Sequence, residues 1–569
     1  MKRLRGEGGR AAGLLALGMA ALLSGCAGPA QLSPVAPQSP PPEVLDETAF
    51  DHFANGTILM LAQNYAAAAE ELEKALAYQP NSREVRFSLG ECYFSQRQFD
   101  KAVAAVSAIE PKDAAVWGQL ASFYRFQGRE EDAYRAYREM LAYDSTNADA
   151  YWYLAQLETR RGRMDAAVSL MEKLTQVRLS PATMAELGRA YWRAGQTDRA
   201  VHTLRMVLDG KYGAPPVDAF GTLADLYINQ AKYAEAAEVL RQGLQAYPEH
   251  AQFRERLVEV LIDGTRYAEA AAELEVLLSR NARVPDQIRL AMLYFQIERY
   301  HEADGLFSLV ARTNPDQYAP HLYLGRLLMM RTQYDSAEVE LARAVEIDDE
   351  NPEAYWHWAN ALLAQDSVAA AIRVAREGEF AAQPKGGLQF LIGVTYSREQ
   401  NYDSAVFWLA KALKSEPSDL RIRFSLGAAY ERAGRFAGAD TTFQMLIAID
   451  SNHAGALNYL GYMYAERGIN LDTSLRLIKR AVSIEPENGA YLDSYAWVLF
   501  KLGQVEEAEI QMRKALERSR QPDPTLYDHF GDILARLGRL PEARAQWAKA
   551  LELDPANDAV KQKLQSAGQ

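Results

Sequence analysis

Cysteine is scarce in this 569-residue chain, which contains only Cys26 and Cys92. Two cysteines cannot build the disulfide framework of a small secreted domain, and they offer few ligands for a structural zinc ion. The eight histidines are scattered without the HExxH spacing of a zinc hydrolase, and there is no GxxxxGK[ST] phosphate-binding loop. We therefore expect no metal, no cofactor and no enzymatic activity.

Positive charge is also in deficit. The 62 lysines and arginines face 75 aspartates and glutamates, so the formal net charge is −13. An acidic chain does not attract the phosphates of DNA or RNA, which excludes nucleic acid as an expected partner. Hydrophobic residues make up 49% of the chain, which is enough for a packed core. No apolar run is long enough to cross a bilayer as a helix.

The first residues have the pattern of a secretion signal, which we place at residues 1–25. A basic head precedes the apolar run Ala11–Leu23, which is too short for a membrane-spanning helix. The run ends in the sequence LSGC at residues 23–26, which resembles the lipobox of bacterial lipoproteins. That resemblance implies cleavage before Cys26 and acylation of this residue, and Ala27 resembles the outer-membrane sorting preference. An ordinary signal with an incidental cysteine is the alternative.

Residues 26–45 combine the lipid-carrying cysteine with a proline-rich tether that has almost no charge. The prolines are Pro29, Pro34, Pro37, Pro40, Pro41 and Pro42. This composition predicts an extended, polyproline-like segment, and at about 3.1 Å per residue it would hold the folded part roughly 50 Å from the membrane. We therefore expect the protein at the outer membrane, lipid-anchored on its periplasmic face.

The rest of the chain is repetitive, with a period of about 34 residues. A small residue and, usually twelve positions later, an alanine recur in fifteen units, as in Gly393 and Ala405, except that Val258 and Ser474 each replace one of them once. The opening position is occupied by Gly56, Gly90, Ala121, Ala155, Gly188, Ala224, Val258, Ala291, Gly325, Ala359, Gly393, Gly427, Gly461, Ala496 and Gly531. Each unit predicts two amphipathic helices joined by a short polar turn, and small residues let the two helices approach closely. Stacked hairpins then share one continuous core.

An aromatic residue often follows the small residue by three positions, and a proline often closes the unit. The tyrosines are Tyr93, Tyr124, Tyr191, Tyr227, Tyr294, Tyr396, Tyr430 and Tyr464, and the prolines are Pro80, Pro248, Pro315, Pro417, Pro486 and Pro555. This pattern resembles the tetratricopeptide repeat (TPR) family. The resemblance implies an all-α fold, a right-handed superhelical solenoid of about 15 helix-turn-helix repeats with a short C-terminal capping helix.

The repeats divide into two predicted arms. Residues 46–209 contain repeats 1–5, and residues 217–555 contain repeats 6–15. Between them, the glycines and prolines of segment 210–216 predict a hinge. The capping helix and tail occupy residues 556–569.

In this family the first helix of each repeat lines a concave groove, which implies two candidate binding stretches. The first, in repeats 3–5, combines arginine with aromatic residues: Arg125, Phe126, Trp152, Arg160, Arg189, Trp192 and Arg193. The second, in repeats 8–10, is apolar: Ile288, Met292, Phe295, Leu322, Met329, Met330, Trp356 and Leu363. Arginines beside aromatic faces suit an acidic peptide or an acidic glycan, and methionines suit an adaptable apolar partner. Packing between adjacent hairpins is the alternative role for all of them.

These features together predict a lipid-anchored TPR scaffold or adaptor. Its partners would be other envelope proteins or acidic peptide segments in polysaccharide-export, pilus or cell-wall machinery. The membrane would be contacted through the lipid anchor only. A lipoprotein that binds a glycan or peptidoglycan directly is the alternative function.

Overall fold

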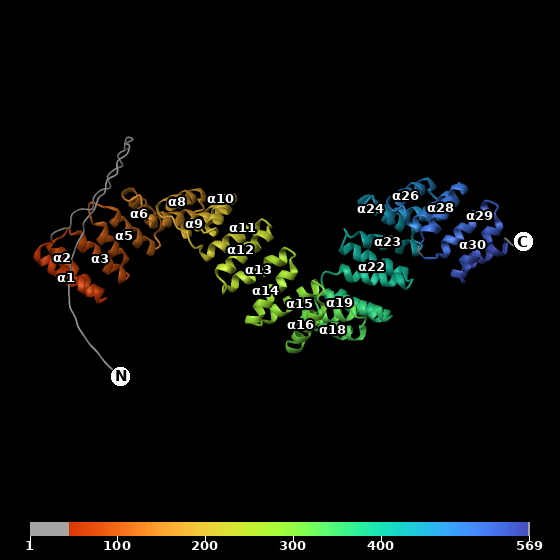
Figure 1. Cartoon of the computed structure of the whole chain (residues 1–569), viewed down its shortest axis with the longest axis horizontal. Coiled ribbons are helices and arrows are strands. Elements are labelled where there is room, and N and C mark those ends of the chain that lie inside the picture. Colours follow the sequence, from red (N-terminus) through yellow and green to blue (C-terminus); the bar gives the residue numbers. More distant parts are fainter. Residues whose placement is uncertain (1–44, 520, 567–569) are drawn as a thin grey trace, which may run out of the picture. The chain divides into compact units, whose positions relative to one another are not determined.

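The computed structural model describes residues 45–519 and 521–566, so the predicted signal and nearly all of the tether, including Cys26, lie outside the described residues. The described residues form 31 α-helices and no strand, which confirms the all-α repeat fold (Figure 1). No helix among them has both the length and the apolar character needed to cross a membrane. The chain divides into two compact units, residues 1–253 and 254–569.

The first unit contains six complete helix pairs, counted over its described residues, and each pair is one repeat. Their bounds are α1 (Glu47–Leu61), α2 (Tyr65–Tyr78), α3 (Arg83–Ser95), α4 (Phe99–Ser107), α5 (Ala114–Phe126), α6 (Glu130–Tyr143), α7 (Ala148–Arg160), α8 (Met164–Val177), α9 (Pro181–Arg193), α10 (Thr197–Leu208), α11 (Val217–Asn229) and α12 (Tyr233–Ala246). The boundary with the second unit falls inside α13 (Ala251–Asp263).

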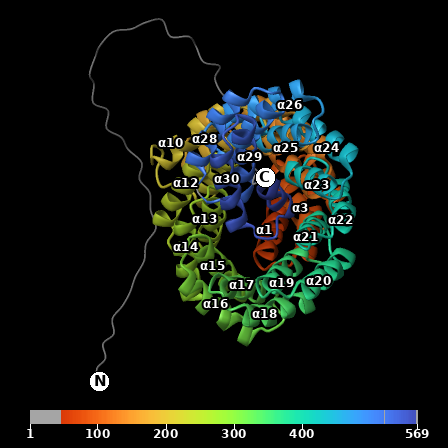
Figure 2. The same cartoon turned by 90° about the vertical axis from the view of Figure 1, so that its right-hand side faces the viewer.

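The second unit continues the same alternation to the end of the described chain. Its further helices are α14 (Tyr267–Arg280), α15 (Val284–Gln296), α16 (Tyr300–Thr313), α17 (Tyr318–Met330), α18 (Tyr334–Ile347), α19 (Pro352–Ala364), α20 (Val368–Ala381), α21 (Gly386–Arg398), α22 (Tyr402–Ser415), α23 (Leu420–Arg432), α24 (Phe436–Ile449), α25 (Ala454–Glu466), α26 (Leu471–Ile484), α27 (Gly489–Lys501), α28 (Val505–Arg518), α29 (Pro524–Arg536), α30 (Leu540–Leu553) and α31 (Asp558–Ser566). Figure 2 shows the first helices α15, α17, α19 and α21 on the inner side of this unit, with α16, α18, α20 and α22 outside them.

Each hairpin closes at the small residue of its first helix. A Cβ atom placed on Gly393 would lie 2.6 Å from Cγ of Leu409 and 3.1 Å from its backbone nitrogen. The same contact, sixteen residues along the chain, recurs from Gly56 to Leu72 and from Gly325 to Leu341. The glycine therefore allows a leucine of the second helix to pack directly on the backbone of the first, and the predicted register is confirmed.

The turn inside each hairpin also repeats, in a way that the sequence pattern did not reveal. Seven positions after the small residue, all fifteen hairpins of the described chain place a residue in the left-handed region, with φ between 54° and 81°. Seven of these residues are glycine, and the other eight include Ala231 and Thr332. Glycine adopts this conformation without steric cost, whereas a β-branched threonine is strained there. Hairpin closure is therefore strong enough to hold unfavourable turn residues in place.

The tyrosine three positions after the small residue binds a carboxylate of the preceding repeat. Tyr191 donates a hydrogen bond of 2.8 Å to Glu172, and the guanidinium of Arg199 lies over the same ring at 4.1 Å. Burial, followed by the carboxylate, raises the pKa of Tyr191 to about 12. Tyr294 makes the equivalent bond of 2.7 Å to Glu275. These contacts connect successive hairpins as well as the two helices of one hairpin.

Repeat 4 reverses this arrangement. The tyrosine position holds Glu158, which is 2% exposed, and Arg161 lies 3.4 Å from its carboxylate. The phenol now comes from the preceding second helix, where burial and a hydrogen bond to Glu158 raise the pKa of Tyr134. The Arg161 guanidinium covers the Tyr134 ring at 4.2 Å. Exchanging phenol and carboxylate between helices thus preserves the same combination of groups.

Helix α31 has the position expected for the capping helix. Its Val560 is fully buried, and Lys563 places its ammonium 2.7 Å from both Asp528 and Asp532 of α29. An apolar contact and two ion pairs therefore cover the last hairpin. In segment 210–216, the phenol of Tyr247 donates a 2.7 Å hydrogen bond to the carbonyl of Pro215. The hinge at 210–216 stays a prediction, because the boundary between compact units is a different feature, inside α13.

Helix α21 provides a matched pair of glycines for testing hairpin closure. We expect Gly393→Ala to destabilise the second unit by about 1–3 kcal/mol, because its Cβ would overlap Leu409. A methyl group added at Gly387 would meet no atom within 4 Å, so Gly387→Ala should be neutral or slightly stabilising. Amide hydrogen exchange should show lost protection near α21 and α22 and none in distant repeats, because each repeat contacts only its neighbours. Equal effects of the two substitutions would contradict the packing account.

Candidate functional site

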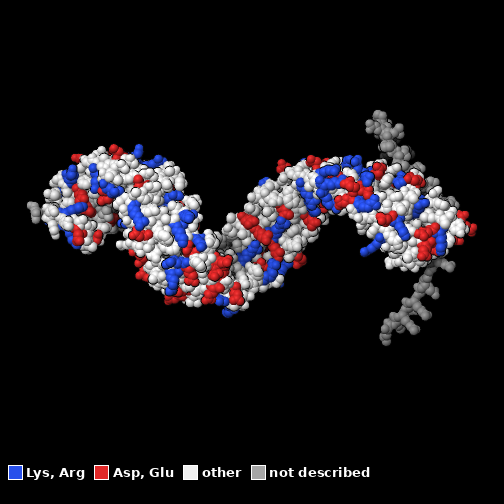
Figure 3. All heavy atoms as spheres, turned by 180° about the vertical axis from the view of Figure 1, so that it is seen from behind, with Lys and Arg blue, Asp and Glu red and all other residues white. Residues whose placement is uncertain are grey.

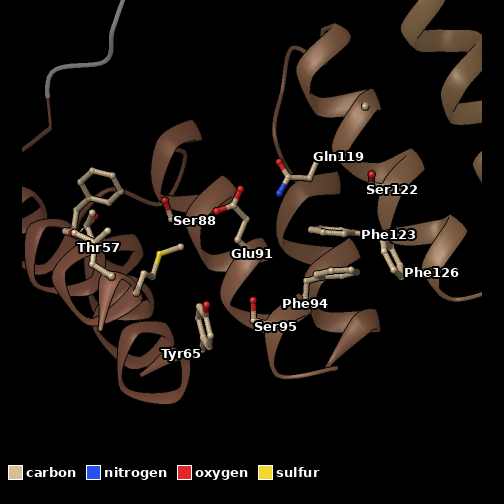
Figure 4. A pocket seen from close by; sticks show the side chains of 14 residues that line it. Thr57, Tyr65, Ser88, Glu91, Phe94, Ser95, Gln119, Ser122, Phe123 and Phe126 are labelled. Atoms are coloured by element: carbon tan, nitrogen blue, oxygen red, sulfur yellow. Dashed lines mark hydrogen bonds between the residues drawn. The ribbon is translucent and has the colours of Figure 1, made fainter. Parts of the chain in front are cut away.

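The first three repeats form a groove on the first unit's inner helices, which we call the N-terminal groove. It has a volume of about 870 Å³ and is lined by α1, the start of α2, α3 and α5. The lining residues are Phe53, Thr57, Met60, Leu61, Tyr65, Ser88, Glu91, Phe94, Ser95, Gly118, Gln119, Ser122, Phe123 and Phe126 (Figure 4). Consecutive first helices therefore supply most of the surface, as the family resemblance implies.

One wall of the groove is aromatic. The rings of Phe94 and Phe123 are stacked with centroids 4.8 Å apart, and Phe126 meets Phe94 edge to face at 5.1 Å. Figure 4 shows these three rings side by side, with Thr57 and Tyr65 across the space from them. Phe126 is 61% exposed, so this wall presents apolar surface that the fold itself does not cover. Such a surface suits an apolar side chain of a partner.

The polar side chains of the N-terminal groove carry a single charge. Ser88, Ser95 and Ser122 present hydroxyls, and Gln119 and Glu91 face each other in Figure 4. Glu91 is exposed, and no cation lies within ion-pair distance of it among the described residues. The hydroxyls of this groove can hydrogen-bond an extended segment, and the free carboxylate of Glu91 can form an ion pair with one positive charge on that segment.

The predicted arginine stretch lies mainly outside this groove, and most of its charges have partners. The Arg125 guanidinium lies over the ring of Tyr153 at 4.2 Å. Arg160 forms an ion pair of 2.8 Å with Glu130 of the preceding repeat, and Arg189 forms one of 3.1 Å with Glu186. Figure 3 shows the same mixture, with basic and acidic side chains interspersed on the visible face.

The other members of this stretch are more open. Arg193 is exposed and has no acid within 4 Å among the described residues, and Trp192 beside it is half-buried. Trp152 is 39% exposed and meets Tyr153 edge to face at 4.8 Å. Phe126 is the one residue of the predicted set that also lines the N-terminal groove. Binding of an acidic partner along this stretch stays a prediction.

The predicted apolar stretch is partly core, and Leu322 is a correction. Leu322 is 2% exposed and packs with Leu341 in the hydrophobic core, so it cannot contact a partner. Three members are well exposed, namely Met292 at 39%, Met330 at 55% and Trp356 at 40%. The half-buried members are Ile288, Phe295, Met329 and Leu363. Phe295 packs on Tyr323 and lies under the guanidinium of Arg326 at 4.8 Å.

Sequence reasoning missed most of the N-terminal groove and a second, smaller groove in repeats 11–13. The second groove includes Arg398 and Arg432, which occupy the position five residues after the small residue. Arg160 and Arg193 occupy that same position in their repeats, so the pattern could have found Arg398 and Arg432. The hydroxyls and phenylalanines of repeats 1–3 carry no comparable charge signal.

Family models for the tetratricopeptide repeat match residues 59–123, 124–178, 222–287, 390–454 and 491–522. The chain belongs to the tetratricopeptide repeat family. These matches and the fifteen hairpins confirm the resemblance, and the inner helices that line the grooves are the first helices of TPR units.

Curated relatives share parts of this repeat array. A TPR repeat-containing protein of Pseudomonas aeruginosa is 29% identical over 151 residues, which are 26% of this chain and 25% of the relative. Cellulose synthase operon protein C of Pseudomonas fluorescens is 22% identical over 498 residues, 80% of this chain and 38% of the relative. The chain therefore spans well under half the length of these two proteins. Among solved structures, the Cut9–Hcn1 complex of the APC/C covers 92% of this chain at 14% identity, with a TM-score of 0.36.

Reactive groups are sparse in the described TPR units. No group of three or more His, Cys, Asp or Glu residues has a metal-binding arrangement there. Burial raises the pKa of the Cys92 thiol to about 11, so this thiol stays protonated at neutral pH.

The most buried titratable pair lies in TPR units 14 and 15. Nδ1 of His529 is 2.9 Å from Oδ1 of Asp493, and both side chains are less than 10% exposed. The imidazole stacks on Trp497 with centroids 3.9 Å apart, and the Trp497 indole donates a 2.6 Å hydrogen bond to Glu466. The network joins α25, α27 and α29, so it ties three consecutive repeats together. No open cavity reaches it among those described, and we assign it a structural role.

This pair makes a pH prediction for the last repeats. Burial disfavours a charge on His529, but Asp493 together with smaller contributions from Asp528 and Glu466 outweighs burial, so the pKa of His529 is raised. A raised pKa in the folded state stabilises the fold fully below the ordinary value of about 6.5, and this stabilisation is lost as the pH rises through the raised value. We expect the free energy of unfolding around α25–α29 to fall across that range.

Hydrogen exchange or denaturant unfolding between pH 5.5 and 9 would measure this effect, with NMR titration of the His529 ring as a direct readout. Asp493→Asn should lower stability and flatten the pH dependence. Asp528 lies nearby but does not bind the imidazole, so Asp528→Asn should retain most of the pH dependence. An unchanged pH profile in Asp493→Asn would show that the pair does not titrate as described.

Proposed function

We propose that this TPR protein is a lipid-anchored adaptor that binds segments of other envelope proteins in its inner grooves. The observation that supports this most is the N-terminal groove, where three first helices combine an aromatic wall with hydroxyls and one free carboxylate. A helix or extended segment lying there would meet Phe94 and Phe126 with apolar side chains and Glu91 with a positive charge. Repeat arrays commonly use such extended surfaces to hold partners.

The envelope setting is supported by the leader pattern and by one relative. Residues 1–25 and Cys26 have the layout of a lipoprotein signal, and the proline-rich tether gives an anchored protein reach. The relative of Pseudomonas fluorescens is named as a cellulose synthase operon protein. We therefore place the adaptor on the periplasmic face of the outer membrane, in polysaccharide-export, pilus or cell-wall machinery.

Direct binding of a glycan or peptidoglycan strand is the second candidate function. The exposed indoles of Trp152 and Trp356 favour it, because flat aromatic faces can stack on sugar rings. We rank it second, because the N-terminal groove devotes a whole wall to phenylalanine and Met60 and Leu61 add to its apolar surface.

The groove can be tested by comparing partner capture between matched variants. Glu91→Arg together with Ser122→Trp should abolish capture of the bound envelope proteins, because one change reverses the charge and the other fills the groove. Glu70→Arg, an exposed charge reversal on the outer helix α2, should leave capture unchanged. Cross-linking in detergent-solubilised envelopes beside a glycan array would measure both outcomes. Capture that survives in the double variant would place the partner site elsewhere on the array.

The anchor makes a separate prediction. Cys26→Ala should prevent incorporation of labelled palmitate, leave the precursor uncleaved at residue 25, and release the protein from the outer-membrane fraction. The matched control is Cys92→Ala, which removes the other thiol and should leave labelling unchanged. A wild-type protein that takes up no palmitate would refute the lipoprotein assignment.

A further inference from the structure

A second groove lies on the inner helices of the second unit, in TPR units 11–13. It has a volume of about 460 Å³ and is bounded by α21, α22, α23 and α25, which Figure 2 labels. Arg398 ends α21 and Arg432 ends α23, so equivalent positions of two consecutive first helices each present a guanidinium. We call this the Arg398–Arg432 groove.

The ion pairs that both guanidiniums make with the fold are long. Arg398 lies 3.6 Å from Asp366, and Arg432 lies 3.6 Å from Glu431, its neighbour in the chain. The two arginine side chains are 62% and 65% exposed. Exposed pairs at this separation contribute little, and the 2.8 Å pair of Arg160 with Glu130 is much closer. Arg432 also hydrogen-bonds the phenol of Tyr459, but a guanidinium has five N–H donors, so both arginines keep donors for a stronger acceptor.

One part of the groove lining is apolar and aromatic. Phe424 and Tyr459 meet edge to face with centroids 5.8 Å apart, and Val394 and Ala428 also line the groove. The hydroxyl of Ser397 is directed to the carbonyl of Gly393 at 3.2 Å, so it is already committed. An occupant must therefore combine a group that binds guanidinium with a side chain that prefers apolar surroundings.

We propose that the Arg398–Arg432 groove binds a peptide segment in which a carboxylate lies beside an apolar or aromatic side chain. A carboxylate matches the planar guanidinium fork in geometry and charge. The apolar neighbour would pack against Phe424 and Tyr459. Gln400, Tyr402 and Ser425 also line the groove, so an acidic sugar is the competing ligand that the test below separates from a peptide. This site is separate from the N-terminal groove, and it specifies which segment the proposed adaptor would bind in its second unit.

The test uses fluorescently labelled octapeptides in which phenylalanine alternates with glutamate. A twin series replaces every glutamate with glutamine, and each peptide is made with a free or an amidated C-terminus. The full-length protein should bind the glutamate peptides at least tenfold more tightly than the amidated glutamine peptide, with affinity that falls as salt rises. Binding of the glutamine peptide with a free C-terminus would show that the terminal carboxylate alone can supply the group that the arginines bind.

Variants locate the binding on the chain. Arg398→Gln with Arg432→Gln should weaken binding of the glutamate peptide at least tenfold. The corresponding double lysine variant should have an affinity between those of the wild type and the double glutamine variant, because lysine keeps the charge without the planar guanidinium. Arg536→Gln removes an arginine from the same position in TPR unit 15 and should bind normally. Glu70→Arg, an exposed charge reversal on the outer helix α2, should also bind normally. Unchanged helical content and melting temperature would show that the exposed substitutions leave the fold intact.

Three results would overturn the proposal. Equal affinity for the glutamate and amidated glutamine peptides would remove the role of the carboxylate. Normal binding by the double glutamine variant would move the site away from Arg398 and Arg432. Binding of trigalacturonic acid with no binding of any peptide would assign the groove to acidic sugars instead.

Discussion

In the eight hairpins of the described chain that open on glycine, a second-helix side chain packs directly against the backbone of the first helix. Leucine does this at Gly56, Gly325 and Gly393, where a single added methyl group would overlap it. Once the two helices are this close, the turn between them must reverse the chain within a few residues, which requires a left-handed residue. The contact also sets which faces remain for neighbouring repeats and for the groove. Turn geometry, repeat stacking and the inner surface therefore follow from one close approach.

Regular positions explain how much of the fold the sequence could predict. The small residue and the alanine after it have a packing reason at each repeat, so their spacing located all fifteen hairpins in register. The left-handed turn position carried no comparable signal, because Thr332, Ala231 and other non-glycine residues occupy it in more than half of the repeats. Repeat 4 shows the opposite case. Glu158 replaces the tyrosine there, and Tyr134 restores the pair from the other helix.

The candidate sites were harder to predict, because groove exposure depends on side-chain size and on neighbours a repeat away. Leu322, Trp152 and Trp356 share one position in their repeats, yet only the indoles extend far enough to be exposed. The pairing of Arg160 with Glu130 joins residues thirty positions apart, which no local pattern reveals. An arginine in this chain is thus available to a partner only where the adjacent repeat supplies no close acid.

That condition explains how one repeated scaffold can carry different chemistry along its inner helices. In TPR units 1–3 the inner surface is aromatic and hydroxylated with the lone carboxylate of Glu91, whereas in units 11–13 it offers Arg398 and Arg432 around apolar side chains. Both surfaces rest on the same backbone contact between the two helices of a hairpin. Because each repeat packs only on its neighbours, groove residues can change without disturbing hairpin closure. Binding specificity in such an array is therefore decided repeat by repeat, while stability is shared by all of them.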